Sequence, residues 1–331
     1  MNYSKVAASV VLTLAMTGMA TASESTINIT GDNSSGATSQ STLASSEASI
    51  VINASESSSV ISQTGDDSAV AKIKQYGDDS TASITQTQES SAPNYLKKRK
   101  AFIDQTALAG NNDAIIVQET AAGEASIKQR DSTTNALAEI YTSGAGSSNM
   151  TIDQASVTGE SKAKILNVSD KTYANQNRDT ATINQVRGSN LDASIAQTGN
   201  ENKSKIQQGY VNGLELTDSK ATINVVGDKN ELSIEQKFGA NNMALAEAFG
   251  DENTIDTLQH GSQNSLTIDV TGNGNSAGDA DFMISQVGSF NSVNASIWGD
   301  NNVSVISQVG DNHIANSMII GSGNTSTITQ Q

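Results

Sequence analysis

The chain has 331 residues, with 19 Lys and Arg against 35 Asp and Glu, and a formal net charge of −16 at pH 7. This acidic balance argues against a nucleic-acid partner held by phosphate contacts, and the absence of Cys excludes disulfides and thiolate metal sites. Only five Phe, six Tyr and one Trp are present, so composition alone would allow disorder and any order must come from sequence periodicity.

Residues 1–22 have the pattern of a secretory signal peptide. Lys5 precedes an apolar run over residues 6–19, and Ala20-Thr21-Ala22 supplies a cleavage site before Ser23. A membrane anchor is the alternative, but the run is short for a bilayer span and is interrupted by small polar residues. We therefore expect the remainder of the chain to be exported and extracellular.

A short phrase then recurs along the chain, as in Asn302-x-Ser304-x-Ile306-x-Gln308-x-Gly310. A small residue, Ile and Gln at alternate positions share one face of a strand, and Gly with Asp or Asn supplies a turn. Residues 23–60 are rich in Ser and Ala and repeat weakly, whereas the phrase is regular over residues 61–331. A fixed short repeat predicts stacked strand-turn-strand coils, because one such strand cannot bury its face alone.

Alternate copies of the phrase form two different columns, which predicts two strands in each coil of about 22–23 residues. After Ile29 and Ile52, the first column is unbroken Gln: Gln75, Gln105, Gln129, Gln154, Gln185, Gln208, Gln236, Gln259, Gln286, Gln308 and Gln330. The second column drifts from amide to apolar: Gln40, Gln63, Gln86, Gln118, Thr142, Asn167, Gln197, Val225, Glu247, Val270, Ile297 and Ile319. We predict an all-β solenoid in which inward amides hydrogen-bond from rung to rung, which also opposes a register slip.

Four longer steps in the repeat predict insertions at corners of the coil. They surround residues 90–100, 170–178, 210–216 and 276–281. The first insertion ends in the only cationic run, Lys97-Lys98-Arg99-Lys100, which we interpret as a solvated loop with an anionic surface as the alternative ligand. The repeat places Glu247 on the inward face, which indicates either a gatekeeper charge or a register that is off by one residue there.

The residues that usually carry chemistry are scarce. His260 and His313 lack neighbours at metal-ligand spacing, and no Ser is distinguished by a neighbouring base. Gly272-Asn273-Gly274-Asn275 is similar to one calcium-binding β-roll repeat, but it occurs once and without the required spacing. The sequence therefore predicts no catalytic site, no metal and no cofactor.

Four phrases resemble the curlin repeat: IKQYGDDS from Ile73, INQVRGSN from Ile183, ISQVGSFN from Ile284 and ISQVGDN from Ile306. The resemblance covers nearly all of the chain after residue 22. It implies a subunit of extracellular curli amyloid that leaves the cell through a dedicated outer-membrane secretion pore. It further implies assembly end to end on a nucleator, in fibres that serve biofilm matrix and adhesion.

Several alternatives remain open at this stage. Relative to the short major subunit of that family, this chain has more repeats, insertions and apolar substitutes for Gln. The resemblance implies a nucleator whose terminal repeat is basic and degenerate, whereas the last repeat here, from Asn324 to Gln330, is regular, which favours a polymerising subunit. A monomeric surface-binding solenoid would need a regular outward row of side chains, and a polysaccharide lyase or hydrolase would need clustered carboxylates; the repeats indicate neither.

Overall fold

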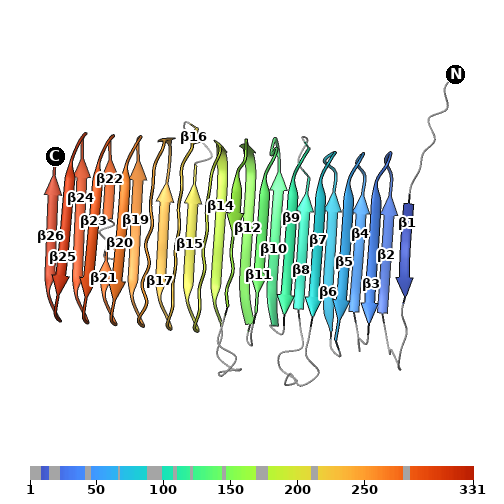
Figure 1. Ribbon diagram of the computed structural model, residues 1–331, viewed down its shortest axis with the longest axis horizontal. Helices are drawn as coiled ribbons and strands as arrows, with labels where there is room; N and C mark the ends of the chain where they lie inside the picture. The colour runs from blue at the N-terminus through green and yellow to red at the C-terminus, as the bar shows by residue number, and fades with distance from the viewer. Residues whose placement is uncertain are drawn as a thin grey trace.

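The computed structural model is an all-β solenoid, as the sequence predicts, and it contains no helix among the residues it describes. These are residues 9–14, 23–41, 46–65, 68–87, 99–106, 110–119, 122–143, 147–168, 178–209, 215–278 and 284–331. The strands stack side by side in two layers along one long axis, with β2 and β26 at opposite ends (Figure 1). Within the described part of the chain, no helix could span a membrane.

The first layer, wall 1, contains the strands that end at the first column of the repeat. Its members are β2 (Ser23–Ile29), β4 (Ser46–Ile52), β6 (Ala69–Gln75), β8 (Arg99–Gln105), β10 (Ala122–Arg130), β12 (Ser147–Thr158), β14 (Thr180–Ser189), β15 (Lys203–Gln208), β17 (Glu231–Gln236), β19 (Thr254–His260), β21 (Ser276–Ala277), β22 (Ile284–Val287), β24 (Val303–Val309) and β26 (Thr325–Gln330). Neighbouring strands are parallel and in register, so identical positions of the repeat lie side by side.

The second layer, wall 2, contains the alternate strands, which run in the opposite direction across the stack (Figure 1). Its members are β1 (Ser9–Leu14), β3 (Ser35–Ser41), β5 (Ser58–Thr64), β7 (Thr81–Thr87), β9 (Asp113–Glu119), β11 (Leu137–Thr142), β13 (Lys162–Lys164), β20 (Ser265–Thr271), β23 (Ser292–Trp298) and β25 (Ile314–Ile320). Two short strands extend wall 1: β16 (Leu216–Thr217) pairs with the end of β14, and β18 (Gly239–Ala240) pairs with β16.

Wall 2 is incompletely paired in its middle. Between β13 and β20 the ladder is reduced to isolated bridges that join Asp192 to Lys220, Lys220 to Met243, and Met243 to Ser265. Wall 1 has continuous strand pairing over the same coils. The two walls therefore differ most in the centre of the stack.

The interior is a narrow sandwich of columns rather than a core of large side chains. Along each strand burial alternates, as in β6, where Ala69, Ala71, Ile73 and Gln75 are buried. Ile at the central position suits an extended backbone because its branched side chain is already restricted, and Ala beside it leaves room for the facing wall. Burial of one Ile side chain contributes about 1.5–3 kcal/mol, so the repeated column is the main apolar contribution.

The fourth insertion does not lie at a corner, contrary to the sequence prediction. β21 and β22 both pair with β19, where Ile255 aligns with Ala277 and Thr257 with Ile284. Six residues of the chain therefore separate two segments that pair on either side of the single residue Asp256, so the extra residues enter within a wall 1 strand and not at a corner. The spacing between repeats gives the number of extra residues but not where along the coil they enter.

The interpretation of the basic run as a solvated loop is wrong for Arg99. It is the first residue of β8, is 1% exposed, and lies in register between Ala69 and Gly123. The small neighbours leave space for the long side chain. Lys97 and Lys98 lie outside the described residues.

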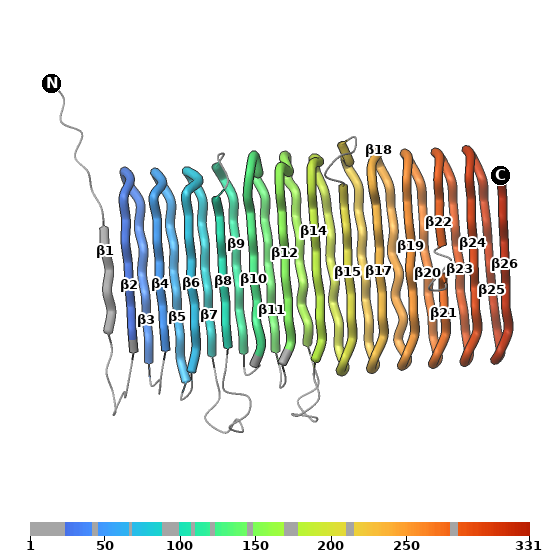
Figure 2. The backbone as a smooth tube through the Cα atoms, turned by 180° about the vertical axis from the view of Figure 1, so that it is seen from behind, coloured from blue at the N-terminus to red at the C-terminus, as the bar shows by residue number. Residues whose placement is uncertain are grey.

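Residues 9–14, within the expected signal peptide, form β1, which pairs in parallel with β3 from Ser9 opposite Ser35 to Leu14 opposite Gln40. β1 is thus the first strand of wall 2, at the end of the stack away from β26 (Figure 1), and the view from behind shows the strands in order from β2 to β26 (Figure 2). Without residues 1–22, β3 would be the edge strand of wall 2 at that end.

Candidate assembly interface: amide ladders and stack edges

All of the predicted ladder glutamines, from Gln75 to Gln330, lie in one in-register column of wall 1. Each Nε2 donates to the Oε1 of the next glutamine toward the C-terminus. The ten N···O distances are 2.8, 2.8, 2.9, 2.8, 2.9, 2.9, 2.8, 3.0, 3.2 and 2.8 Å. The column therefore has a direction, with acceptors toward the N-terminal end of the stack and donors toward the C-terminal end.

The second N–H of the rungs ties wall 1 to wall 2. Gln129 donates to the carbonyl oxygen of Asp113 at 3.1 Å, Gln308 to that of Ser292 at 3.2 Å, and Gln330 to that of Ile314 at 3.0 Å. At the other end of the column, the Ser59 hydroxyl donates to Gln75 Oε1. A one-residue slip of either wall would break both sets of bonds, so the amides specify register as well as stability.

Wall 2 carries a second, shorter ladder at the N-terminal end. Gln40 donates to Gln63 at 2.9 Å, Gln63 to Gln86 at 2.9 Å, and Gln86 to Gln118 at 2.7 Å, again from Nε2 to Oε1. The direction is the same as in wall 1. Gln40 Oε1, at the start of this ladder, is buried and has no hydrogen-bond partner among the described residues.

The wall 2 ladder fails where the column changes from amide to apolar. Asn167 and Gln197 are 0% and 1% exposed, and both side-chain polar atoms of each lack a partner within the described chain. The next rung after Gln197 is Val225, which offers no acceptor to an amide. An unsatisfied buried polar group costs about 1–3 kcal/mol, so this is the weakest part of the column.

Glu247 does not point inward. Lys220 bridges Met243, which places Ala248 beside Val225, and Ala248 is 0% exposed while Glu247 lies on the outer face. The inward placement is therefore incorrect, and the alternative, a register that is off by one residue, is confirmed. A step of 11 or of 12 residues fits the turn before this strand equally well, and only strand pairing decides between them.

Asparagine ladders at the corners were missed by the sequence reasoning. On the wall 1 side, each Asn Oδ1 accepts the backbone N–H of the next Asn at 2.9–3.0 Å, through Asn202, Asn230, Asn253, Asn275, Asn302 and Asn324. Asn242, Asn264 and Asn291 repeat this at the other corner at 3.1 Å. Most of their Nδ2 atoms donate to turn glycines, as from Asn253 to Gly272 O at 2.8 Å, whereas Asn230 donates to Val226 O at 3.2 Å. The sequence signal was an Asn six residues before the column residue. Six residues span one full strand, so this Asn lies at a corner.

The turn glycines adopt conformations that exclude a side chain. Gly288 has φ of +122°, and a Cβ on it would lie 1.9 Å from the carbonyl oxygen of Gly310 in the next coil. That carbonyl is the one to which Asn291 Nδ2 donates, at 2.8 Å. The close stacking of successive turns thus depends on glycine at this position.

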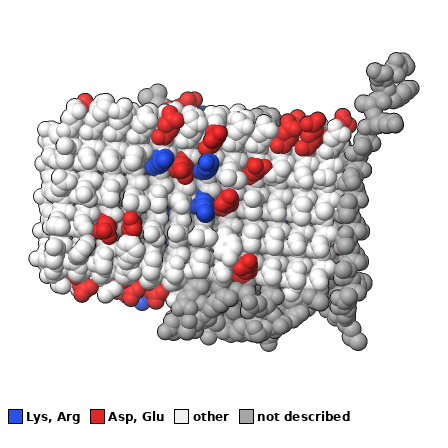
Figure 3. Space-filling model, viewed as in Figure 1, with Lys and Arg blue, Asp and Glu red and all other residues white. Residues whose placement is uncertain are grey.

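The C-terminal edge combines an open strand with an apolar outer face. Ile314, Met318 and Ile320 of β25 are 65%, 75% and 68% exposed, and Trp298, which aligns with Ile320, is 54% exposed. On the face toward the viewer in Figure 3, few charged side chains appear at this end of the molecule, whereas Lys, Arg, Asp and Glu are mixed over the centre. β25 pairs only with β23, and β26 only with β24, among the described strands.

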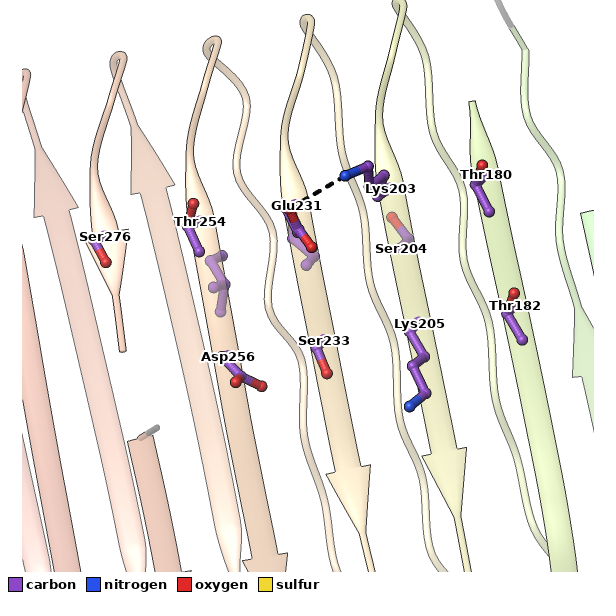
Figure 4. Close-up of a pocket in the computed structure, with 12 residues that line it drawn as sticks. Thr180, Thr182, Lys203, Ser204, Lys205, Glu231, Ser233, Thr254, Asp256 and Ser276 are labelled. Atoms are coloured by element: carbon purple, nitrogen blue, oxygen red, sulfur yellow. Dashed lines mark ion pairs between the residues drawn. The ribbon is translucent and has the colours of Figure 1, made fainter. Parts of the chain in front are cut away.

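The outer face of wall 1 holds an open groove of about 940 Å³ across β14, β15, β17 and β19. Its side chains include Thr182, Lys203, Lys205, Glu231 and Asp256, and Lys203 Nζ lies 3.7 Å from Glu231 Oε2 (Figure 4). Burial raises the pKa of Asp256, although a hydrogen bond with Ser233 acts in the opposite direction. The groove could hold a polar ligand, but its carboxylates come from alternate positions of adjacent strands rather than from one facing pair.

The two histidines are not brought together into a metal site. His260 packs edge-on against Phe238 with ring centroids 3.8 Å apart, and burial lowers its pKa. His313 takes a corner position, where its backbone N–H donates to Asn291 Oδ1 at 3.0 Å. Among the described residues, no group of three or more His, Asp or Glu could hold a metal ion.

Comparison of the chain with protein-family models and with curated proteins found no match. Fold and geometry therefore define a class, a two-walled β-solenoid with internal amide ladders and open edge strands, and the arguments on function start from that class.

Proposed function

We propose that the protein is a secreted structural subunit that assembles end to end into extracellular, curli-like amyloid fibres that contribute to biofilm matrix and adhesion. The observation that carries the proposal is the directional column from Gln75 to Gln330. Its last rung presents an amide N–H at an open edge. A strand edge with unpaired backbone groups and an unsatisfied amide is a template for another strand of the same register.

The resemblance of the repeats to curlin supports the same function. On that analogy the signal peptide directs export, an outer-membrane pore releases the chain, and a nucleator at the cell surface starts assembly. The regular rung of β26 favours a polymerising subunit over the nucleator. No catalytic role enters this proposal.

Assembly of the purified chain tests the proposal. The chain beginning at Ser23, incubated at rising concentration, should form fibres with a strand spacing of about 4.7–4.8 Å along the fibre axis and should bind amyloid dyes. Fragments of preformed fibres should remove the lag phase. A chain that stays monomeric at high concentration, with no cross-β diffraction, would overturn the proposal.

A monomeric surface-binding protein is the second candidate, and the groove beside Lys205 and Asp256 is the observation that favours it. In that case the soluble monomer should bind a polar polymer such as an anionic polysaccharide. Substitution of groove residues should abolish binding without changing the state of association.

A further inference from the structure

The described part of the chain after residue 22 has its first and its last strand on the same wall. Its first strand, β2, and its last strand, β26, both belong to wall 1. Successive full strands alternate between the walls, so the strand that follows β26 in an uninterrupted stack must lie on wall 2, beside β25. A second copy can place its β2 there only if it is rotated by half a turn about the stack axis. Because the two walls run in opposite directions, that rotation superposes one wall on the other (Figure 1).

The half-turn brings together columns of the same chemistry. The next copy's β3 falls beside β26, which aligns its Gln40 with Gln330, and its β2 falls beside β25, which aligns its Ile29 with Ile319. The free N–H of Gln330 Nε2 then faces Gln40 Oε1, the buried acceptor that lacks a partner within the described chain. The donor and acceptor also have the direction that every ladder bond within the chain has.

A junction without rotation fails on the same criteria. It would place Ile29 of the next copy beside Gln330 and leave a one-strand gap next to β25. The chain contains an example of this mismatch, because Gln197 is followed by Val225 and its amide has no partner in the described structure. Where apolar Ile52 precedes Gln75, by contrast, the Ser59 hydroxyl occupies the Gln75 acceptor. Among the described residues, no hydroxyl donates to Gln40 Oε1.

The central positions of the repeat tolerate the half-turn. It would place Thr38 beside Ile328, and wall 1 already contains the series Ile234, Thr257, Ile284 in register. The Thr38 hydroxyl is bonded to Ser25 at 2.6 Å within its own copy. The amide columns thus decide between the two junctions, and the central column permits either.

We infer that consecutive subunits in the fibre are related by a half-turn about its axis, with Gln330 of one copy donating to Gln40 of the next. The walls exchange places at every junction. The amide column of wall 1 continues into the wall 2 ladder from Gln40 to Gln118, and the apolar column ending at Ile319 continues into Ile29 and Ile52. This inference rests on the proposed function and on removal of β1, which in the full chain occupies the β3 edge.

Cross-linking across the junction tests the inference, since the chain has no Cys of its own. Ser39 and Asn28 both face outward and are exposed on the first coil, and Thr329 is exposed on β26. The half-turn places Thr329 beside Ser39 of the next copy, whereas the unrotated junction places it beside Asn28. Fibres of S39C/T329C should be joined into multimers by a short thiol cross-linker, and fibres of the matched N28C/T329C variant should remain monomers after denaturation.

The opposite pattern, or fibres that cross-link in neither variant, would overturn the half-turn while leaving the proposed function intact. Failure of the Cys-free parent to form fibres would overturn the proposed function itself. The full chain, in which β1 covers the edge of β3, provides a further test. It should add to fibre ends at least about tenfold more slowly, because the Gln40 edge is covered; elongation at the parental rate would contradict the junction.

A double-mutant cycle gives an independent readout. Gln40 and Gln330 lie at opposite ends of one molecule, so any coupling between them in fibre elongation must cross a junction. Gln40→Ile and Gln330→Ile should each slow elongation, and the double variant should elongate about tenfold faster than the product of the two single effects. Additive effects would overturn the half-turn; coupling of Gln330→Ile with Ile29→Gln instead would indicate the unrotated junction.

Discussion

The N-terminal and C-terminal coils hold the same fold with different distributions of amides. In the N-terminal coils wall 2 carries a Gln ladder from β3 to β9, wall 1 carries one from β6 onward, and the corner positions of wall 2 include Ser34, Ser57 and Ser80. In the coils after residue 202, wall 2 is apolar and Asn ladders run along both corners. The buried amides of wall 2 therefore lie in the wall in the N-terminal coils and at the corners in the C-terminal coils.

The region between the two halves shows what happens when neither arrangement is complete. Asn167 and Gln197 are amides in a wall without partners, and the same part of wall 2 is paired by isolated bridges. Corner ties from Asn242 onward begin only after this segment. Stability should thus be lowest in the middle of the stack, away from the edges where assembly is proposed.

Breaking the one ladder that both halves share should have the largest effect. In Gln208→Ala, Gln185 loses its acceptor, Gln236 loses its donor, and the bond to Ser219 O at 3.1 Å is lost. We expect the free energy of unfolding to fall by about 3 kcal/mol or more, measured by urea denaturation. Ile297→Val, which deletes one methylene from the apolar wall, should cost about 1 kcal/mol and should slow fibre growth less. Equal effects of the two variants would contradict the role of the column.

Removal of a corner hydrogen-bonding side chain should reduce stability more in the C-terminal half than in the N-terminal half. Asn253→Ala leaves the buried N–H of Asn275 and the carbonyl of Gly272 without partners, at a cost of about 2 kcal/mol. Ser57→Ala at the equivalent type of corner removes a bond of 2.9 Å to Gly77 O and one of 3.3 Å from Ser80 N, and should cost about 1 kcal/mol. Thermal unfolding of the two variants checks the difference; a larger effect for Ser57 would show that the Asn ladders are not the stronger tie.

Much of this arrangement could be predicted from the sequence, because in-register stacking makes every position of the repeat a column. The alternation of Ile and Gln gave the inward face, and the difference between alternate copies gave two walls. The errors at Glu247 and Arg99 have a common cause. Both residues follow turns or insertions, where one more or one fewer residue reverses the inward face, and the sequence contains no signal that decides it. The missing acceptor of Gln197, by contrast, could be read from the sequence, because Val225 follows it in the second column.

Repair of the central segment should stabilise the chain. Gln197→Leu keeps a similar volume and removes two buried polar atoms that have no partner in the described structure, so we expect a gain of about 1 kcal/mol. The matched change Gln86→Leu should destabilise, because Gln86 accepts from Gln63 and donates to Gln118. Chemical denaturation of both variants tests the pair, and a loss of stability in Gln197→Leu would indicate that a buried water satisfies this amide.

The two halves also differ in the charges on the outer face of wall 1, and this difference should have the smallest effect on stability. In the N-terminal half, Asp104 lies in register between Lys74 and Lys128, so that charges alternate along the column. In the C-terminal half, Asp256 has Ser233 on one side and the interrupted strand on the other. Burial raises the pKa of Asp256, so the unfolded chain releases this proton at a lower pH than the folded chain does.

The sign of the pH dependence follows from that difference. As pH rises from the ordinary Asp value of 3.8 through the raised pKa of the folded state, the Asp256 carboxylate forms more readily in the unfolded chain, and stability is lost. Asp256→Asn should therefore raise the melting temperature at neutral pH and leave it nearly unchanged at pH values below 3.8. Asp104→Asn should instead lower it at neutral pH by the equivalent of a few tenths of a kcal/mol, because two cross-strand attractions are lost. If both substitutions shifted stability in the same direction at neutral pH, the charge environment of the two halves would not differ as the strand pairing implies.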